Sequence, residues 1–224
     1  MVLAYLNFKG LKMITAVEAS MRNLEVLNMA PVVPVLVVED VTKAFDLGTA
    51  LVAGGLPALE VTLRTDGALD VIAEMARVKG GFVGAGTLLT PQDVKEAKAA
   101  GAQFGVSPGA TDVLIAACES MGLPLLPGAA TASESMRLLE KGYSVQKFFP
   151  AEASGGAKAL GSFASPLSQI NFCPTGGIST KNACDYLSLS NVICVGGSWV
   201  APRDFVISGE WTAIEALARA ASQL

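Results

Sequence analysis

Eight short apolar segments recur along this chain at intervals of roughly 20 to 26 residues, about the length of one strand, one helix and their loops. They occupy residues 32–38, 59–64, 82–88, 104–108, 124–127, 145–149, 171–174 and 192–196. Nearly continuous apolar runs are typical of parallel strands that are buried on both faces. Eight such units in 224 residues favour an α/β fold, a single (β/α)8 barrel.

Helix signals fill the intervals between these segments. Thr90 followed by Pro91 predicts an N-cap and a proline at the first helical position. Thr131 and Glu134 have the spacing of a capping box. Five glycines stand where a left-handed residue would close a helix just before the next strand. They are Gly55, Gly80, Gly101, Gly122 and Gly142.

No linker or low-complexity break interrupts this pattern, so we expect one domain over residues 1–224. We expect residues 13–27 to form an extra helix ahead of the first strand. We expect residues 1–12 to be a poorly ordered extension. A doubly wound open sheet is the alternative fold. It is disfavoured because no GxGxxG turn follows an early strand.

Charge and composition exclude several functional classes. A net charge of −4 argues against a nucleic-acid surface or a polybasic membrane anchor. No segment reaches the roughly 20 apolar residues needed to span a bilayer. The chain has no histidine, which argues against a zinc-dependent aldolase, a Ser-His-Asp hydrolase and histidine-based proton transfer. We therefore expect no metal and no cofactor.

The four cysteines show no CxxC pairing, and two of them lie inside apolar runs. Small buried thiols are common in protein cores. We interpret all four as reduced core residues of a cytoplasmic protein. They are Cys118, Cys173, Cys184 and Cys194.

Lys147 stands out among the polar residues at the ends of the predicted strands. Apart from Gln146, its segment is apolar. Apolar surroundings disfavour an ammonium, so a free amine becomes available, and such an amine can attack a ketone to form a Schiff base. The alternative is a lysine that points outward or pairs with a carboxylate.

Glu60 and Arg64 lie four residues apart on one predicted strand. Because side chains alternate along a strand, both would face the barrel interior together with Thr62. Inward charges are costly unless they are paired or functional. Arginine suits recognition of a substrate carboxylate, and a carboxylate can move protons. The alternative is a structural ion pair between Glu60 and Arg64.

Glycine pairs follow the last two predicted strands, where barrels often bind phosphate. The first pair is Gly176 and Gly177, after Thr175; the second ends with Gly197, before Ser198. Glycines expose backbone N–H groups, and the two hydroxyls could add donors. A single glycine pair could merely serve a tight turn. The prediction of a phosphate site therefore depends on the presence of such a pair after each of two adjacent strands.

Five motifs resemble one known family, the 2-keto-3-deoxy-6-phosphogluconate (KDPG) and 4-hydroxy-2-oxoglutarate aldolases. They are Glu-Val-Thr-Leu-Arg-Thr (60–65), Gly-Ala-Gly-Thr (84–87), Lys-Phe-Phe-Pro-Ala-Glu (147–152), Phe-Cys-Pro-Thr-Gly-Gly-Ile (172–178) and Gly-Gly-Ser-Trp (196–199). The resemblance covers roughly residues 31–202. It implies a homotrimeric (β/α)8 Schiff-base aldolase of the Entner–Doudoroff pathway. Its small-molecule partners would be a phosphorylated keto acid and pyruvate.

The resemblance also implies individual roles. Lys147 would be the Schiff-base lysine and Glu60 the general acid/base. Arg64 and Thr87 would hold the carboxylate of the pyruvyl group, with Thr175 nearby. The residues implied to bind the phosphate are Gly176, Gly177, Gly197 and Ser198. Phe149 is implied to form an apolar wall of the pocket.

Three alternatives remain open at this level. The substrate could be the galactonate epimer of KDPG, since one hydroxyl distinguishes the two. A phosphosugar isomerase or epimerase would share the barrel and the phosphate site but give Lys147 no covalent role. A non-catalytic sensor of phosphorylated ligands would need neither Lys147 nor Glu60.

Overall fold

Parallel strands form two sheets in the computed structural model, which describes residues 13–224. The predicted extension over residues 1–12 lies outside the described residues. The larger sheet has the order β5-β4-β3-β2-β1-β9, and the smaller has the order β6-β7-β8. The strands are β1 (Val32–Leu36), β2 (Ala58–Thr62), β3 (Phe82–Gly86), β4 (Phe104–Val106), β5 (Leu125–Leu126), β6 (Gly128–Ala129), β7 (Val145–Phe148), β8 (Asn171–Pro174) and β9 (Val195–Gly197).

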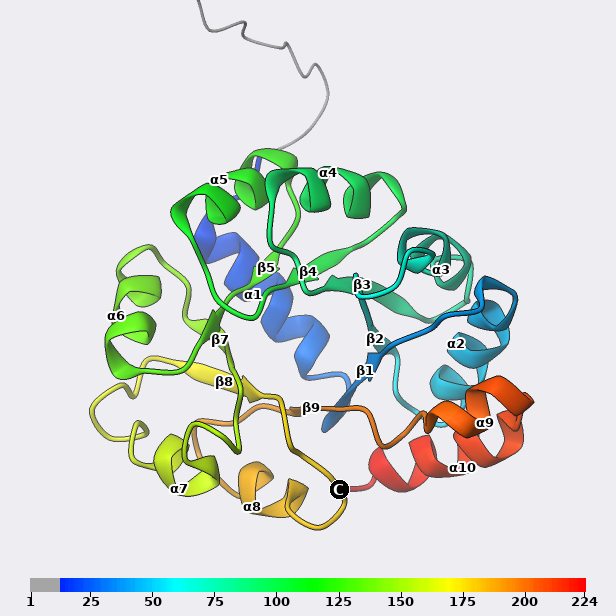
Figure 1. Ribbon diagram of the computed structural model, residues 1–224. Helices are drawn as coiled ribbons and strands as arrows, with labels where there is room; N and C mark the ends of the chain where they lie inside the picture. Colours follow the sequence, from blue (N-terminus) through cyan, green and yellow to red (C-terminus); the bar gives the residue numbers. More distant parts are fainter. Residues whose placement is uncertain (1–12) are drawn as a thin grey trace, which may run out of the picture.

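The six-stranded sheet is curled, and the two sheets face a shared interior (Figure 1). Isolated parallel bridges join Phe172 to Val192 and Thr175 to Gly196, beside β8 and β9. At the other edge Pro127 separates β5, which pairs with β4, from β6, which pairs with β7. The predicted strand over 124–127 is present as the shorter β5, and it ends before Pro127 because a proline has no N–H to donate to a neighbouring strand.

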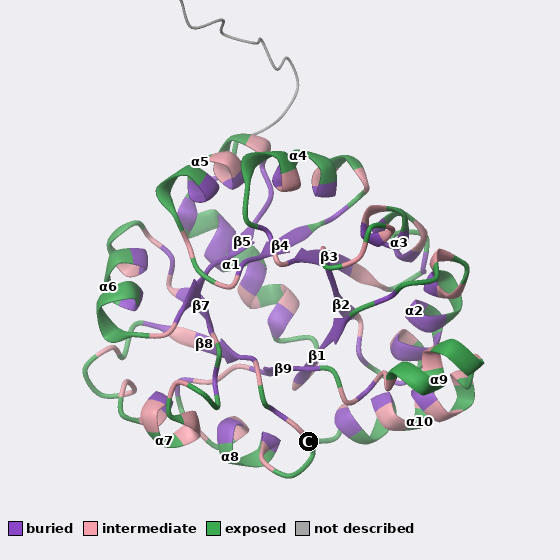
Figure 2. Cartoon of the chain, viewed as in Figure 1, coloured by how far each residue is buried: buried purple, intermediate pink, exposed green. Residues whose placement is uncertain are grey.

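Helices surround the sheets on the outside (Figure 1). They are α1 (Ala16–Leu27), the 3-10 turn η1 (Val41–Lys43), α2 (Ala44–Ala53), α3 (Ala68–Met75), α4 (Pro91–Ala99), α5 (Asp112–Met121), α6 (Ala132–Glu140), α7 (Gly156–Gly161), α8 (Ala183–Leu187), α9 (Arg203–Ser208) and α10 (Trp211–Ala221). Figure 2 shows that the strands are mostly buried and that the helices are exposed on their outer faces. Within residues 13–224, no helix is both long enough and apolar enough to cross a bilayer.

The predicted helix boundaries are confirmed where they depend on local chemistry. Thr90 caps α4, with Pro91 in the first turn. At α6 the Thr131 hydroxyl accepts from the Glu134 N–H at 3.2 Å, while the Glu134 carboxylate accepts from the Thr131 N–H at 3.0 Å. The five predicted glycines all have positive φ, between +62° and +104°. Glycine adopts this backbone conformation without a steric penalty.

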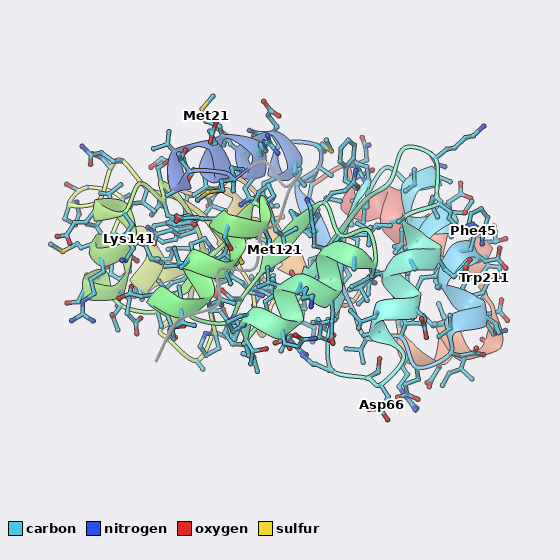
Figure 3. The ribbon with its side chains drawn as sticks, turned by 90° about the horizontal axis from the view of Figure 1, so that it is seen from above. Met21, Phe45, Asp66, Met121, Lys141 and Trp211 are labelled. Atoms are coloured by element: carbon cyan, nitrogen blue, oxygen red, sulfur yellow. The ribbon has the colours of Figure 1, made fainter. Side chains whose placement is uncertain are left out.

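The extra helix α1 covers the amino-terminal end of the curled sheet. Its Ser20 hydroxyl donates to the Gly142 carbonyl at 3.3 Å and accepts from the Ser144 N–H at 3.1 Å, just ahead of β7. Figure 3, turned by 90° from Figure 1, shows Met21 of α1 at one end of the molecule and Asp66 at the other. Asp66 lies in the loop that follows β2, so the carboxyl ends of the strands are not covered by α1.

The prediction that the cysteines are core residues is confirmed for three of them and wrong for one. All four thiols are free; Cys118, Cys173 and Cys194 are buried, but Cys184 is exposed. Cys184 belongs to the short helix α8, of which only one face packs inward. Burial raises the pKa of the Cys118 thiol to about 12, so this group remains protonated at neutral pH.

We predict that Thr131→Ala lowers the free energy of unfolding by about 1 kcal/mol, because the α6 N-cap loses its side-chain acceptor. Activity per folded molecule should not change. Thr212→Ala is the matched control, since Thr212 is an exposed helical threonine that caps nothing. Chemical denaturation of both variants measures the difference. Equal stabilities would contradict the capping role.

Candidate active site

A cavity of about 490 Å³ lies at the carboxyl ends of the strands, the end that carries Asp66 in Figure 3. Nine of the ten predicted site residues line it. They are Arg64, Thr87, Lys147, Phe149, Thr175, Gly176, Gly177, Gly197 and Ser198. The tenth, Glu60, lies behind Lys147 in the interior of the curled sheet. The cavity also has an apolar lining that was not predicted, to which Val35 and Ile178 contribute.

Lys147 and Glu60 form a buried pair at the base of this cavity. The Lys147 Nζ donates to the Glu60 Oε1 at 3.3 Å, and each residue is only 3% exposed. The Phe149 ring centroid lies 5.1 Å from the same nitrogen, a cation–π contact. The alternative of an outward-pointing Lys147 is therefore wrong. Its carboxylate partner is Glu60, the residue predicted to move protons.

Glu60 fits beside Lys147 because the neighbouring strand carries a glycine. In the pairing of β2 with β3, Glu60 lies opposite Gly84 and Thr62 opposite Gly86. A Cβ atom at Gly86 would come within 2.7 Å of the Glu60 Cγ. No role was predicted for Gly86, although it belongs to the Gly-Ala-Gly-Thr motif. Any larger residue there would displace the carboxylate.

Arg64 and Thr87 form a second polar pair at the rim of the cavity. β2 ends at Thr62, so Arg64 lies in the following turn, where its side chain is exposed. Its Nε donates to the Thr87 Oγ1 at 3.2 Å. Because Glu60 pairs with Lys147 instead, the alternative Glu60–Arg64 ion pair does not form. The remaining guanidinium N–H groups can bind an anion.

The backbone of Thr87 has a φ of +64°, unusual for a β-branched residue. Left-handed conformations cost such residues about 1–2 kcal/mol, and outliers of this kind cluster at functional sites. The conformation accompanies the contact between the Thr87 hydroxyl and Arg64. A functional role for this contact would account for the retention of a strained residue.

Thr175 and the glycine pair that follows it form the opposite wall. The Thr175 Oγ1 is buried and has no hydrogen-bond partner in residues 13–224. Gly176 and Gly177 have φ values of +103° and +79°. No group in the described part of the chain accepts from either amide N–H. Unpaired N–H groups beside a cavity are suited to an anionic ligand. Ser198 lines the cavity next to them.

No metal site is evident in the described chain: between residues 13 and 224, no three Cys, Asp or Glu side chains gather closely enough to hold an ion. The polar groups of the cavity are instead an amine, a carboxylate, a guanidinium, hydroxyls and backbone amides. On a parallel α/β fold, such a set of groups is suited to an enzyme that holds an anionic small molecule beside a buried amine.

Comparison with known proteins identifies the family. Residues 24–217 match the family model described as KDPG and KHG aldolase. The chain is 51% identical to the 2-dehydro-3-deoxy-phosphogluconate aldolase of Pseudoalteromonas atlantica, over 88% of this chain and 92% of that protein. The chain therefore belongs to the KDPG and KHG aldolase family, whose members are carbon–carbon lyases.

Solved structures agree with this assignment. The KDPG aldolase of Legionella pneumophila, with pyruvate captured as a covalent carbinolamine intermediate, has a TM-score of 0.86 and 42% identity. The match covers 89% of this chain and 97% of that one. The KDPG aldolase of Zymomonas mobilis with 3-phosphoglycerate has a TM-score of 0.84 and 47% identity, over 90% and 96%.

We predict that Thr87→Ala and Thr87→Gly both lower kcat/KM by about 10-fold, because each removes the hydroxyl beside Arg64. Thr87→Gly should be more stable than Thr87→Ala by about 1 kcal/mol, since only glycine adopts this φ without strain. Steady-state kinetics and chemical denaturation measure the two effects. An alanine variant as stable as the glycine variant would show that the backbone is not strained.

Proposed function

We propose that the protein cleaves 2-keto-3-deoxy-6-phosphogluconate to pyruvate and glyceraldehyde 3-phosphate through a Schiff base on Lys147. We also propose a second activity, the cleavage of 4-hydroxy-2-oxoglutarate to pyruvate and glyoxylate. The observation that carries the proposal is the buried Lys147–Glu60 pair at the base of the cavity. The pyruvate carbinolamine of the Legionella relative supports the same chemistry.

The first half of the reaction forms the imine. Transfer of a proton from Lys147 to Glu60 neutralises both groups of the buried pair and leaves a free amine, which attacks the C2 ketone. Glu60 then gives this proton to the carbinolamine hydroxyl, which leaves as water, so that a protonated imine forms and Glu60 is again a carboxylate. The positively charged imine withdraws electrons from the C3–C4 bond and so replaces a metal as the electron sink.

The second half breaks the carbon–carbon bond. Glu60, directly or through a water molecule, removes the proton of the C4 hydroxyl, and its distance of 3.3 Å from the Lys147 Nζ supports this role. The C3–C4 bond then breaks and glyceraldehyde 3-phosphate leaves. Protonation of the remaining enamine at C3 and hydrolysis of the imine release pyruvate and the free lysine.

The walls of the cavity orient the substrate in this proposal. Arg64 and Thr87 bind the carboxylate next to C2, with Thr175 nearby, and the guanidinium offers two parallel donors for it. Phe149 forms an apolar wall beside the Lys147 Nζ. This wall limits water around the imine, where a low dielectric strengthens the charge interactions of the transition state.

The terminal phosphate is assigned to the glycine-rich wall, formed by Gly176, Gly177, Gly197 and Ser198. Backbone N–H groups must supply most of the attraction, because the net charge of −4 provides no broad positive field. The unpaired amides of Gly176 and Gly177 support this assignment. So does the relative from Zymomonas, which binds 3-phosphoglycerate.

We further infer that the two sheets form one closed (β/α)8 barrel within a single domain spanning the chain. The bridge between Thr175 and Gly196 supports closure on one side. On the other side, β5 and β6 flank Pro127 and pair with strands of different sheets. A homotrimer follows from the family resemblance, and the free thiols are consistent with a cytoplasmic protein.

Borohydride reduction in the presence of pyruvate tests the covalent step. We expect one reduced adduct per chain, located on Lys147 by mass spectrometry, and none in Lys147→Arg. Lys98 provides the control, because burial lowers the pKa of this half-buried lysine, yet it donates to the Gly122 carbonyl away from the cavity. Lys98→Arg should trap normally. Trapping on another lysine, or no trapping, would exclude the Schiff-base mechanism and favour an isomerase or a sensor.

For Glu60→Gln we predict that aldol cleavage falls by about 10²–10⁴, the usual range for loss of a general acid or base. Imine formation with pyruvate should survive in part. Because the substitution leaves the buried Lys147 without a counter-charge, stability will also fall, and turnover must be normalised to folded protein. Near-normal turnover per folded molecule would reduce Glu60 to a structural partner.

A further inference from the structure

Glu152 ends the Lys-Phe-Phe-Pro-Ala-Glu motif, yet it has no part in the mechanism above and does not line the cavity. We propose that Glu152, held by Tyr186, is a positioning residue for the Gly176–Gly177 turn and so determines the affinity for the substrate's terminal phosphate. The inference rests on the phosphate assignment in the proposed function. It adds Glu152, in the turn after β7, and Tyr186, on α8, to the residues that determine specificity for the phosphorylated substrate.

Backbone and side chain of Glu152 both contact this turn. The Glu152 N–H donates to the Gly176 carbonyl at 3.1 Å. The Glu152 side chain lies against Gly177, where an added Cβ atom would come within 2.6 Å of the Glu152 Cγ. The space that a side chain at position 177 would need is therefore filled by Glu152, which supports the turn from outside the cavity.

The outer side of the turn is held at a second point. The Asn182 Nδ2 donates to the Gly177 carbonyl at 3.1 Å, while the Asn182 Oδ1 accepts from the Ser179 N–H at 2.8 Å. Both carbonyls, of Gly176 and Gly177, thus have donors on the protein side. Their amide N–H groups have no partner in the described chain and are available to a ligand.

Tyr186 fixes the orientation of Glu152. Its hydroxyl donates to the Glu152 Oε1, and the tyrosine is fully buried in α8, whereas Glu152 is an exposed residue. Burial and the bond to Glu152 raise the pKa of the Tyr186 phenol, so it remains a donor at neutral pH. The carboxylate is directed toward Tyr186 and the start of α7, where an added Cβ at Gly156 would lie 3.3 Å from Oε1.

This arrangement matters because the carboxylate is negative and close to a proposed phosphate site. With the Tyr186 hydroxyl in place, the charge is held outside the cavity while the aliphatic part of Glu152 supports Gly177. Without the hydroxyl, the carboxylate can turn and the support loosens. Both effects weaken phosphate binding, and neither reaches Lys147 or Glu60.

The test compares Tyr186→Phe and Glu152→Ala with wild type on phosphorylated and dephosphorylated 2-keto-3-deoxygluconate. We expect KM for the phosphorylated substrate, and the inhibition constant of inorganic phosphate, to rise about 10-fold, the effect of losing one charge-assisted hydrogen bond. Changes in kcat/KM for the dephosphorylated substrate and in pyruvate imine formation should be much smaller. Glu152→Gln retains an acceptor for Tyr186 and the packing against Gly177, so it should restore near-normal KM.

Tyr143→Phe is the matched control. Tyr143 is also fully buried and donates to a glutamate, Glu119, at 3.3 Å, but it precedes β7 at the amino-terminal end of the sheet. It should lose stability without any change in the phosphate-dependent KM. If Tyr186→Phe loses stability without a change in the phosphate-dependent KM, as expected for Tyr143→Phe, the positioning role is overturned. The same holds if Tyr186→Phe affects both substrates equally. In both cases the phosphate site itself still stands. A wild type without preference for the phosphorylated substrate would overturn the phosphate site itself, and this inference with it.

Discussion

The ion pair between Lys147 and Glu60 is the interaction on which the rest of the site depends. Both groups are almost completely buried, 3.3 Å apart, in the interior of a curled sheet. Burying either charge alone would be strongly unfavourable, so β2 and β7 must bring the two side chains together. The same burial removes competing water from the amine. Stability and chemistry thus impose the same geometry on two strands that belong to different sheets.

Glycines create the space for the polar side chains of this site. Gly86 leaves room for the Glu60 carboxyl, and an added Cβ at Gly196 would overlap the Thr175 side chain. Gly177 likewise leaves room for the Glu152 side chain. In a close-packed interior, a large polar side chain needs a small neighbour on the adjacent strand or turn. The glycine-rich motifs therefore serve packing as well as backbone contact with anions.

Features governed by neighbouring residues were predictable from the sequence. The capping box at Thr131 and the positive φ at Gly142 each depend on a few adjacent residues, and both are confirmed. One error arose where distant packing decides the outcome: the exposure of Cys184 depends on how α8 lies against the sheet. Residues 124–127 do contain the strand β5, but which strand the chain joins before and after Pro127 depends on residues far away in the sequence.

The sequence by itself determined the α/β rhythm, the family motifs and nine of the residues that line the cavity. Only the tertiary structure decided which of them interact. Glu60 had two possible cationic partners, Arg64 four residues away and Lys147 at a separation of 87 residues, and it pairs with the distant one. No local pattern encodes that choice, because it follows from which strands face each other across the interior. The support of Gly177 by Glu152 and Tyr186 is likewise a property of folded loops from separate parts of the chain.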